Sequence, residues 1–205
     1  FHLILVGPKI FFLPPLVNKM SSTDQRKYSF SCLRKDDEYM TPTYALRDLF
    51  NYVKIDPTKD KIFEPFYGTG YSTKIIKDMG YKVTPGKEVD FFKVNFPKRN
   101  SILVTNPPFS IKREILHHVF VTKKCKRFAI LLPSQTVFSA YFHKMVKENN
   151  INIKILIPHA RIQFVKNGVK TRCNALDTCW ITSGIDLPDV QGGSHFMPAI
   201  GPRDG

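Results

Sequence analysis

Short runs rich in apolar and β-branched residues alternate along the chain with longer segments whose apolar residues recur every three or four positions. The short runs predict strands, and the most apolar of them predict strands buried on both faces of a parallel sheet. These strands are expected at residues 62–64, 81–84, 102–104, 128–133, 153–157 and 175–182. The segments with helical spacing predict amphipathic helices at residues 45–53, 72–80, 111–120 and 137–146. This alternation predicts a three-layer α/β fold with a mainly parallel sheet.

One hydrophobic core is expected. With 205 residues, 42% of them hydrophobic, the chain is long enough for one sizeable core and too short for two ordinary domains. We assign residues 36–182 to the α/β domain. Residues 1–35 are predicted to be an N-terminal extension that is disordered or artefactual in part, and the Gly-, Pro- and Asp-rich residues 183–205 a disordered tail.

Residues 1–19 form an apolar but interrupted stretch. They begin at Phe1 rather than Met, and Lys9, Pro14 and Pro15 break the apolar run. The stretch is too short and too broken for a transmembrane helix, and it lacks the small-residue cleavage site of a signal peptide, which is the weaker alternative. We treat it as a fragment artefact, a translated upstream sequence or a disordered extension, and assign it no function.

The formal net charge of +14 predicts a polyanionic partner. The basic residues are spread along the chain, and their field attracts phosphates. Nucleic acid is the expected partner and no membrane is, although charge alone also fits a generic basic protein. The four cysteines form no C-x-x-C pair and the six histidines add no zinc-like spacing, so no metal site is predicted. Sparse cysteines favour an intracellular compartment, cytoplasmic or nuclear, over secretion.

The most informative stretch is the tetrapeptide Asn106-Pro107-Pro108-Phe109, which follows the predicted strand at residues 102–104. Two prolines end that strand because neither donates a backbone hydrogen bond. Ligands of open α/β sheets bind at the carboxyl ends of strands. The tetrapeptide is therefore expected where a ligand binds, although it also fits a proline-rich loop that merely ends a strand.

These residue types suit the activation of a planar amino group. Such a nitrogen is a poor nucleophile because its lone pair is delocalised into the adjoining ring or carbonyl. The side-chain oxygen of Asn106 and the carbonyl of Pro107 can each accept one of its hydrogens, since Pro108 has no N–H. These two hydrogen bonds would push the nitrogen toward tetrahedral geometry and expose its lone pair. Phe109 offers a stacking face, worth about 1–3 kcal/mol per base.

The tetrapeptide resembles motif IV of the S-adenosylmethionine-dependent amino methyltransferases, above all the adenine-N6 DNA methyltransferases. This resemblance implies a Rossmann-like methyltransferase fold, S-adenosylmethionine as cofactor, and methyl transfer to N6 of adenine in DNA. The same motif serves RNA adenine methyltransferases and release-factor glutamine methyltransferases, which remain alternatives. Outside enzymes, the alternative is a catalytically inactive fold kept as a basic nucleic-acid-binding module.

A second motif precedes the tetrapeptide. Glu64 and Pro65 end a predicted strand, and Gly68 and Gly70 lie in the turn before a predicted helix. Glycines allow a ligand to approach the backbone closely, and the N–H groups at a helix start attract its polar end. This segment resembles motif I, which implies that the four residues bind the cofactor; an ordinary tight turn between strand and helix is the alternative.

Two further segments resemble cofactor-binding motifs. Tyr39, Thr41 and Pro42 precede a predicted helix, where Thr41 suits the N-cap and Pro42 the first turn; they resemble motif X, which borders the methionine end of the cofactor. Asp90 and Phe91 resemble motif III, which implies contact with the cofactor's adenine, although Asp90 also fits a solvated turn. Glu88 is the nearest candidate for the acid that binds the ribose.

The loop after residue 158 carries the expected substrate contacts. Arg161 and Phe164 form an Arg-x-x-Phe pattern similar to motif VIII, in which an aromatic ring holds the flipped base from the side opposite Phe109. Phe164 fits equally well as an anchor of the loop. Residues 133–180 are filled by the fold itself and leave no room for a separate target-recognition domain, so a partner protein is a candidate source of specificity.

Overall fold

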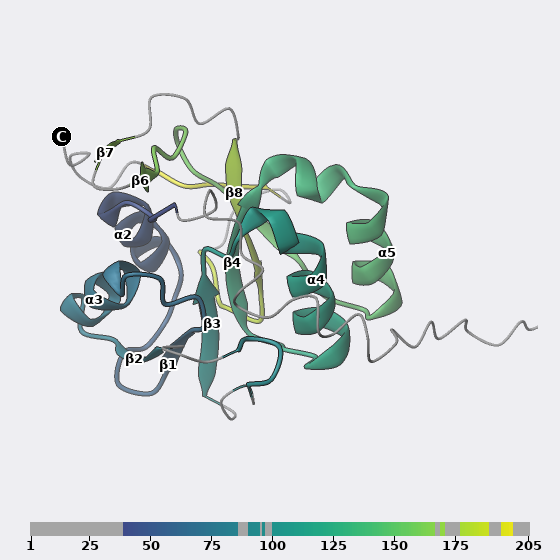
Figure 1. Cartoon of the computed structure of the whole chain (residues 1–205), viewed down its shortest axis with the longest axis horizontal. Helices are drawn as coiled ribbons and strands as arrows, with labels where there is room; N and C mark the ends of the chain where they lie inside the picture. Colours follow the sequence, from purple (N-terminus) through teal and green to yellow (C-terminus); the bar gives the residue numbers. More distant parts are fainter. Residues whose placement is uncertain are drawn as a thin grey trace, which may run out of the picture.

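The computed structural model describes residues 39–85, 90–94, 96, 100–166, 169–170, 177–188 and 194–198. Within these ranges the chain forms an α/β fold on a seven-stranded mixed sheet (Figure 1). Its α-helices are α2 (Thr43–Tyr52), α3 (Tyr71–Asp78), α4 (Lys112–His117) and α5 (Ala140–Glu148). None of the helices in these ranges combines the length and the apolar composition needed to cross a membrane.

The sheet has the strand order β2-β1-β3-β4-β8-β5-β9. Its strands are β1 (Lys61–Glu64), β2 (Lys82–Pro85), β3 (Ser101–Thr105), β4 (Phe128–Pro133), β5 (Lys154–Ile157), β8 (Thr178–Ser183) and β9 (Ser194–Phe196). Strands β2, β1, β3 and β4 run parallel to one another, and β8 runs antiparallel between β4 and β5. A separate antiparallel pair joins β6 (Val165–Lys166) to β7 (Val169–Lys170). The predicted α/β class and mainly parallel sheet are confirmed.

Side chains of the central strands divide the core into two layers, because successive residues of a strand point to opposite faces. One face packs against α2 and α3 through Ile102, Val104, Ala129 and Leu131. The other face packs against α4 and α5 through Leu103, Phe128, Ile130 and Leu132. Figure 1 shows the two helix pairs on opposite sides of the sheet. The uninterrupted apolar runs in the sequence therefore correspond to strands that are covered on both faces.

The carboxyl-terminal part of the chain differs from the prediction of a disordered tail over residues 183–205. Strand β9 pairs in parallel with β5, and Lys54 bridges to Asp186. Ile185, Leu187 and Met197 are buried in the core layer that contains α2. The prediction rested on average composition, whereas three well-spaced apolar side chains and one strand edge are enough to hold these segments.

Two predicted helices are less regular than their spacing suggested. The segment predicted at residues 111–120 begins with the 3₁₀ turn η4 (Phe109–Ile111), continues as α4 and ends in the π-helical turn η5 (His118–Thr122). Helix α5 follows the 3₁₀ turn η6 (Ser134–Phe138). At the start of α2, Pro42 is the N-cap and no side chain caps the helix, so the predicted N-cap role of Thr41 is not realised.

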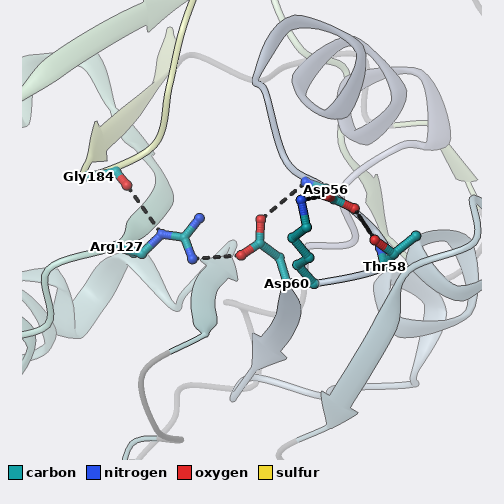
Figure 2. A network of polar contacts seen from close by, with 6 residues as sticks. Asp56, Thr58, Asp60, Arg127 and Gly184 are labelled. Atoms are coloured by element: carbon teal, nitrogen blue, oxygen red, sulfur yellow. Dashed lines mark hydrogen bonds and ion pairs between the residues drawn. The ribbon is translucent and has the colours of Figure 1, made fainter.

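A polar network ties strands together at the edge of the sheet where β1 and β4 begin (Figure 2). The Arg127 guanidinium donates to Asp60 Oδ1 at 2.7 Å and to the carbonyl of Gly184 at 3.3 Å. Asp60 also accepts from the backbone N–H of Asp56 at 3.1 Å. The guanidinium of Arg127 lowers the pKa of Asp60. The network lies at the amino ends of the parallel strands, opposite the end where ligands of such sheets bind, so we expect it to contribute to stability.

Candidate active site

The two principal motifs meet at the opposite, carboxyl edge of the sheet. Strands β1 and β3 are parallel neighbours, with Ile62 paired to Ile102. The chain leaves β1 for α3 on one face and β3 for α4 on the other, so the strand order reverses between them. Ligands of open α/β sheets bind at such a reversal. Glu64 and the Gly-x-Gly turn follow β1, and Asn106 follows β3, so the sequence motifs converge on this position.

Glu64 links the two strand ends. Thr105 Oγ1 donates to Glu64 Oε1 at 2.6 Å, and the N–H of Phe66 donates to the same oxygen at 3.1 Å. The Glu64 side chain is buried, and this burial raises its pKa to about 8, although the two hydrogen bonds oppose the shift. Thr105 was not singled out from the sequence; the signal was a hydroxyl residue directly between an apolar run and Asn106.

Asn106 presents a buried hydrogen-bond acceptor. Its Nδ2 donates to the backbone carbonyl of Tyr39 at 3.0 Å, which fixes the amide orientation because a carbonyl oxygen can only accept. Asn106 Oδ1 is buried and has no hydrogen-bond partner in the part of the chain that the structure describes. A buried acceptor without a donor is unfavourable by about 1–3 kcal/mol. The arrangement is thus ready to accept a hydrogen bond from a ligand.

The segment before α2, residues 39–42, lies beside Asn106. Met40 and Val165 exchange backbone hydrogen bonds of 2.9 and 3.1 Å, which join this segment to the loop after β5. Thr41 and Pro42 are buried, and Thr41 Oγ1 has no partner among the described residues. The predicted motif X residues therefore lie against Asn106 through Tyr39, and the backbone carbonyl of Tyr39, rather than its ring, makes the contact.

The rings of Phe109 and Phe164 lie close together at right angles. Their ring centroids are 6.1 Å apart with an interplanar angle of 83°, and Tyr39 also meets Phe164 edge-on at 6.3 Å. Phe164 is buried, and Phe109 is half-buried. Phe164 is 3% exposed and packs in the core, so in this structure it anchors the loop. To hold a flat base opposite Phe109, the Phe164 ring would have to turn out of the core. Pro107 and Pro108, which precede the 3₁₀ turn η4, are buried.

Arg161 is engaged in an ion pair. Its Nε lies 2.7 Å from Asp177 Oδ1, and both side chains are more than half exposed. Such an exposed pair is worth at most about 1 kcal/mol. A phosphate can therefore compete with Asp177 for the guanidinium. The structure places Arg161 in the predicted loop without bringing it into contact with Asn106.

The Gly-x-Gly turn has the geometry that needs glycine. Gly68 has φ +50° and Gly70 has φ +82°, both in the left-handed region. A Cβ on Gly68 would meet no atom within 4 Å, whereas a Cβ on Gly70 would lie 2.5 Å from Tyr67 Oη. Pro65 is buried at the start of this loop. Thr69 Oγ1 reaches Met40 Sδ at 3.4 Å, so the turn adjoins the segment that contacts Asn106.

The predicted adenine-binding residues occupy a different environment. Phe91 is only 2% exposed. Its ring centroid lies 4.7 Å from that of Phe66 and 5.2 Å from that of His118. Its ring therefore belongs to the core and has no free face for a cofactor ring, which differs from the prediction. Asp90 Oδ1 accepts from the N–H of Phe92 at 3.0 Å, and its Oδ2 pairs with Lys93 at 3.3 Å. Glu88 lies outside the described residues.

Comparison with known proteins does not assign this chain to a family. The chain matches no protein-family model and no curated protein. In the described ranges, no group of three or more His, Cys, Asp or Glu side chains is placed to hold a metal ion. Function must therefore be inferred from the arrangement of Glu64, Thr105, Asn106 and the surrounding aromatic rings.

Proposed function

We propose that the protein transfers a methyl group from S-adenosylmethionine to the exocyclic amino group, N6, of adenine in DNA. The observation that carries this proposal is the buried Oδ1 of Asn106, which has no hydrogen-bond partner among the described residues and lies where the strand order reverses. Its orientation is fixed because Asn106 Nδ2 donates to the Tyr39 carbonyl. On this proposal the α/β sheet is that of a Rossmann-like methyltransferase. The order of the matched segments along the chain also supports the resemblance.

In the proposed reaction the chain's own groups prepare the amine. Asn106 Oδ1 accepts one hydrogen of the amino group and the carbonyl of Pro107 accepts the other, which localises the nitrogen lone pair. Phe109 stacks on the base and excludes water from it. The cofactor, when bound, supplies an electrophilic methyl group on its sulfonium. No charged base is required for the attack, because the two hydrogen bonds raise the nucleophilicity of the nitrogen. The cofactor would leave as the neutral thioether S-adenosylhomocysteine, and the methylated amine would release its extra proton to water.

The residues after β1 suit a cofactor of this kind. The open space beside Gly68 lets a ligand approach the backbone. The first turn of α3 directs N–H groups toward the same edge, which favours the carboxylate of a bound amino acid moiety. Glu64 supplies a buried carboxyl whose ionised form a positively charged ligand would stabilise. We expect Gly68, Gly70, Glu64 and Pro65 to hold the cofactor, with Tyr39, Thr41 and Pro42 at its methionine end.

DNA is the proposed substrate because of the charge of the chain. A net charge of +14 favours a polyanion, and an aromatic pair beside the amine-binding position favours a flat base. RNA adenine would satisfy the same groups. A glutamine side chain would use Asn106 in the same way but would have no need of Phe164 as a stacking face.

The test is transfer of labelled methyl from S-adenosylmethionine to unmethylated duplex DNA, single-stranded DNA, RNA and a release-factor protein in parallel. Label in DNA is expected with the wild-type protein and with Asn51→Ala, a control on the exposed side of α2. We expect at least a hundredfold loss with Asn106→Ala, about the effect of removing one preorganised hydrogen-bonding group from an active site. Label in RNA or protein alone would replace the substrate. Absence of both label and cofactor binding would favour an inactive nucleic-acid-binding module.

A further inference from the structure

Phe138 is the most exposed large apolar side chain in the described part of the molecule, at 81%. It ends the 3₁₀ turn η6, which connects β4 to α5. A single exposed apolar residue is ordinary on a protein surface and needs no explanation by itself. What distinguishes Phe138 is the rigidity of its turn and its position relative to Asn106 and Phe109.

The turn that carries Phe138 is fixed on both sides. After it, the Ser139 backbone N–H and Oγ both bond to the carbonyl of Thr136, at 3.1 and 2.7 Å. Before it, the carbonyl of Val137 lies 2.6 Å from His143 Nε2. The Phe138 ring is therefore presented to solvent by an ordered turn, so little conformational entropy of the backbone would be lost when a ligand covers it.

Phe138 lies at the same end of the sheet as the candidate active site, the end formed by the carboxyl ends of the parallel strands. Strands β3 and β4 are parallel, with Thr105 paired to Ile130. Strand β4 continues to Pro133, three residues farther, which carries η6 about 10 Å beyond the end of β3. Turn η6 therefore lies beyond the carboxyl end of β3, where the segment with Asn106 and Phe109 begins. We call η6 the rim of the candidate site, on the side of α4 and α5.

Two cations at the start of α4 contact Phe109 and α5. Lys112 Nζ donates to the backbone carbonyl of Phe109 at 3.3 Å. The guanidinium carbon of its neighbour Arg113 lies 5.3 Å from the centre of the Tyr141 ring, in the first turn of α5 just after Phe138. Neither cation forms an ion pair with any residue that the structure describes. These contacts join Phe109 to Lys112 and Arg113 to Tyr141, and Phe138 precedes Tyr141 by three residues. We call these five residues the rim strip.

We propose that the rim strip binds the DNA substrate next to the extruded adenine, with Phe138 stacked on a neighbouring base and with Lys112 and Arg113 on the phosphates between them. The strip combines three aromatic rings with two cations that form no ion pair among the described residues, and rings with cations bind bases and backbone together. The net charge of +14 argues for a polyanion over an apolar peptide as the occupant. This inference rests on the proposed function, since it names the surface that receives the rest of the substrate.

The experiment compares Phe138→Ala, Phe138→Trp and Phe196→Ala with the wild type. Phe196 is the matched control because it is also exposed, at 70%, but lies on β9, the outermost strand of the sheet, three strands away from β4. Equilibrium binding to an adenine-containing duplex at fixed salt is measured without cofactor, and the KM for DNA and the cofactor affinity are measured separately. Removal of one stacking ring is expected to weaken DNA binding at least about fivefold.

The expected result is this loss in Phe138→Ala, recovery in Phe138→Trp and wild-type binding in Phe196→Ala, with the cofactor affinity and melting temperature unchanged in all three. DNA binding by Phe138→Ala equal to that of Phe196→Ala would overturn the inference. If the wild type methylates DNA and Phe138→Ala does so with an unchanged KM, the rim strip is refuted and the proposed function stands. If no methyl is transferred but Phe138→Ala still loses DNA binding, the proposed function falls and the binding surface remains.

Discussion

Replacing Glu64 by Gln is expected to stabilise the protein at neutral and alkaline pH. Glu64 is buried and accepts hydrogen bonds from Thr105 and Phe66 through a single oxygen, Oε1. A glutamine Oε1 can accept the same two bonds in the same position. The substitution therefore keeps these two hydrogen bonds and a side chain of the same shape, and it removes the ionisable group.

The magnitude follows from the shift in the pKa of Glu64, from an ordinary 4.5 to about 8. Between these two pKa values the folded protein retains a proton on Glu64 that the unfolded chain releases. The contribution of Glu64 to the free energy of unfolding therefore falls as the pH rises from 4.5 to 8 and is constant outside that range. This loss amounts to about 3 kcal/mol at pH 7 and rises toward about 5 kcal/mol by pH 9. Glu64→Gln has no such loss.

The assay is urea denaturation of the wild type and Glu64→Gln at pH 4.5, 7 and 9 without cofactor. The two are expected to be nearly equal at pH 4.5 and to diverge progressively as the pH rises. Glu148→Gln is the control, because Glu148 is 59% exposed and its pair with Lys144 is long, at 3.9 Å. A stability difference that does not change with pH would refute the reasoning.

The same variant separates stability from function. A buried carboxyl that destabilises the fold at working pH is expected where it serves a ligand. Glu64→Gln is therefore expected to bind S-adenosylmethionine more weakly, seen as a smaller cofactor-induced rise in melting temperature, although its own melting temperature is higher. Unchanged cofactor binding would remove Glu64 from the proposed site and leave the pH argument intact.

Two further substitutions test the turn after β1 and the opposite edge of the sheet. Gly70→Ala places a Cβ 2.5 Å from Tyr67 Oη at φ +82°, so it is expected to destabilise the fold by about 1–3 kcal/mol and to weaken cofactor binding in a thermal-shift assay. Arg127→Gln leaves Asp60 without its partner and is expected to lower the free energy of unfolding by about 1–3 kcal/mol at pH 7 while methyl transfer is unchanged. Because the guanidinium lowers the pKa of Asp60, this difference should shrink as the pH falls below 3.8; a constant difference would contradict the ion-pair explanation.

The sheet was predictable because its central strands β3 and β4 contain uninterrupted apolar runs, at residues 102–104 and 128–133. Leu103 and Val104 face opposite layers, and only a strand covered on both sides requires both to be apolar. The placement of β9 was not predictable from composition, since β9 is short and its stability comes from pairing with β5, far away in the sequence. The 3₁₀ and π-helical turns around α4 were also missed, because periodicity does not resolve local departures from helical geometry.

In the candidate site, sequence reasoning identified which segments matter better than it identified which atoms make the contacts. The chemistry of an amide followed by two prolines led to Asn106, but the contact to the Tyr39 carbonyl joins positions 67 residues apart and involves the backbone. Thr105 was overlooked because a single hydroxyl residue carries little pattern. Phe91 has the right residue type for its predicted role, yet its burial depends on Phe66 and His118, which no local pattern shows.

The most direct test of the central claim is chemical identification of the product. Duplex DNA treated with the protein and S-adenosylmethionine is digested to nucleosides and analysed by mass spectrometry, with Asn106→Ala and Asn51→Ala in parallel. The account predicts N6-methyldeoxyadenosine from the wild type and from Asn51→Ala, and at least a hundredfold less from Asn106→Ala. Equal product from Asn106→Ala, or a methyl group on any atom other than an exocyclic amine, would contradict the role given to the unpartnered oxygen of Asn106.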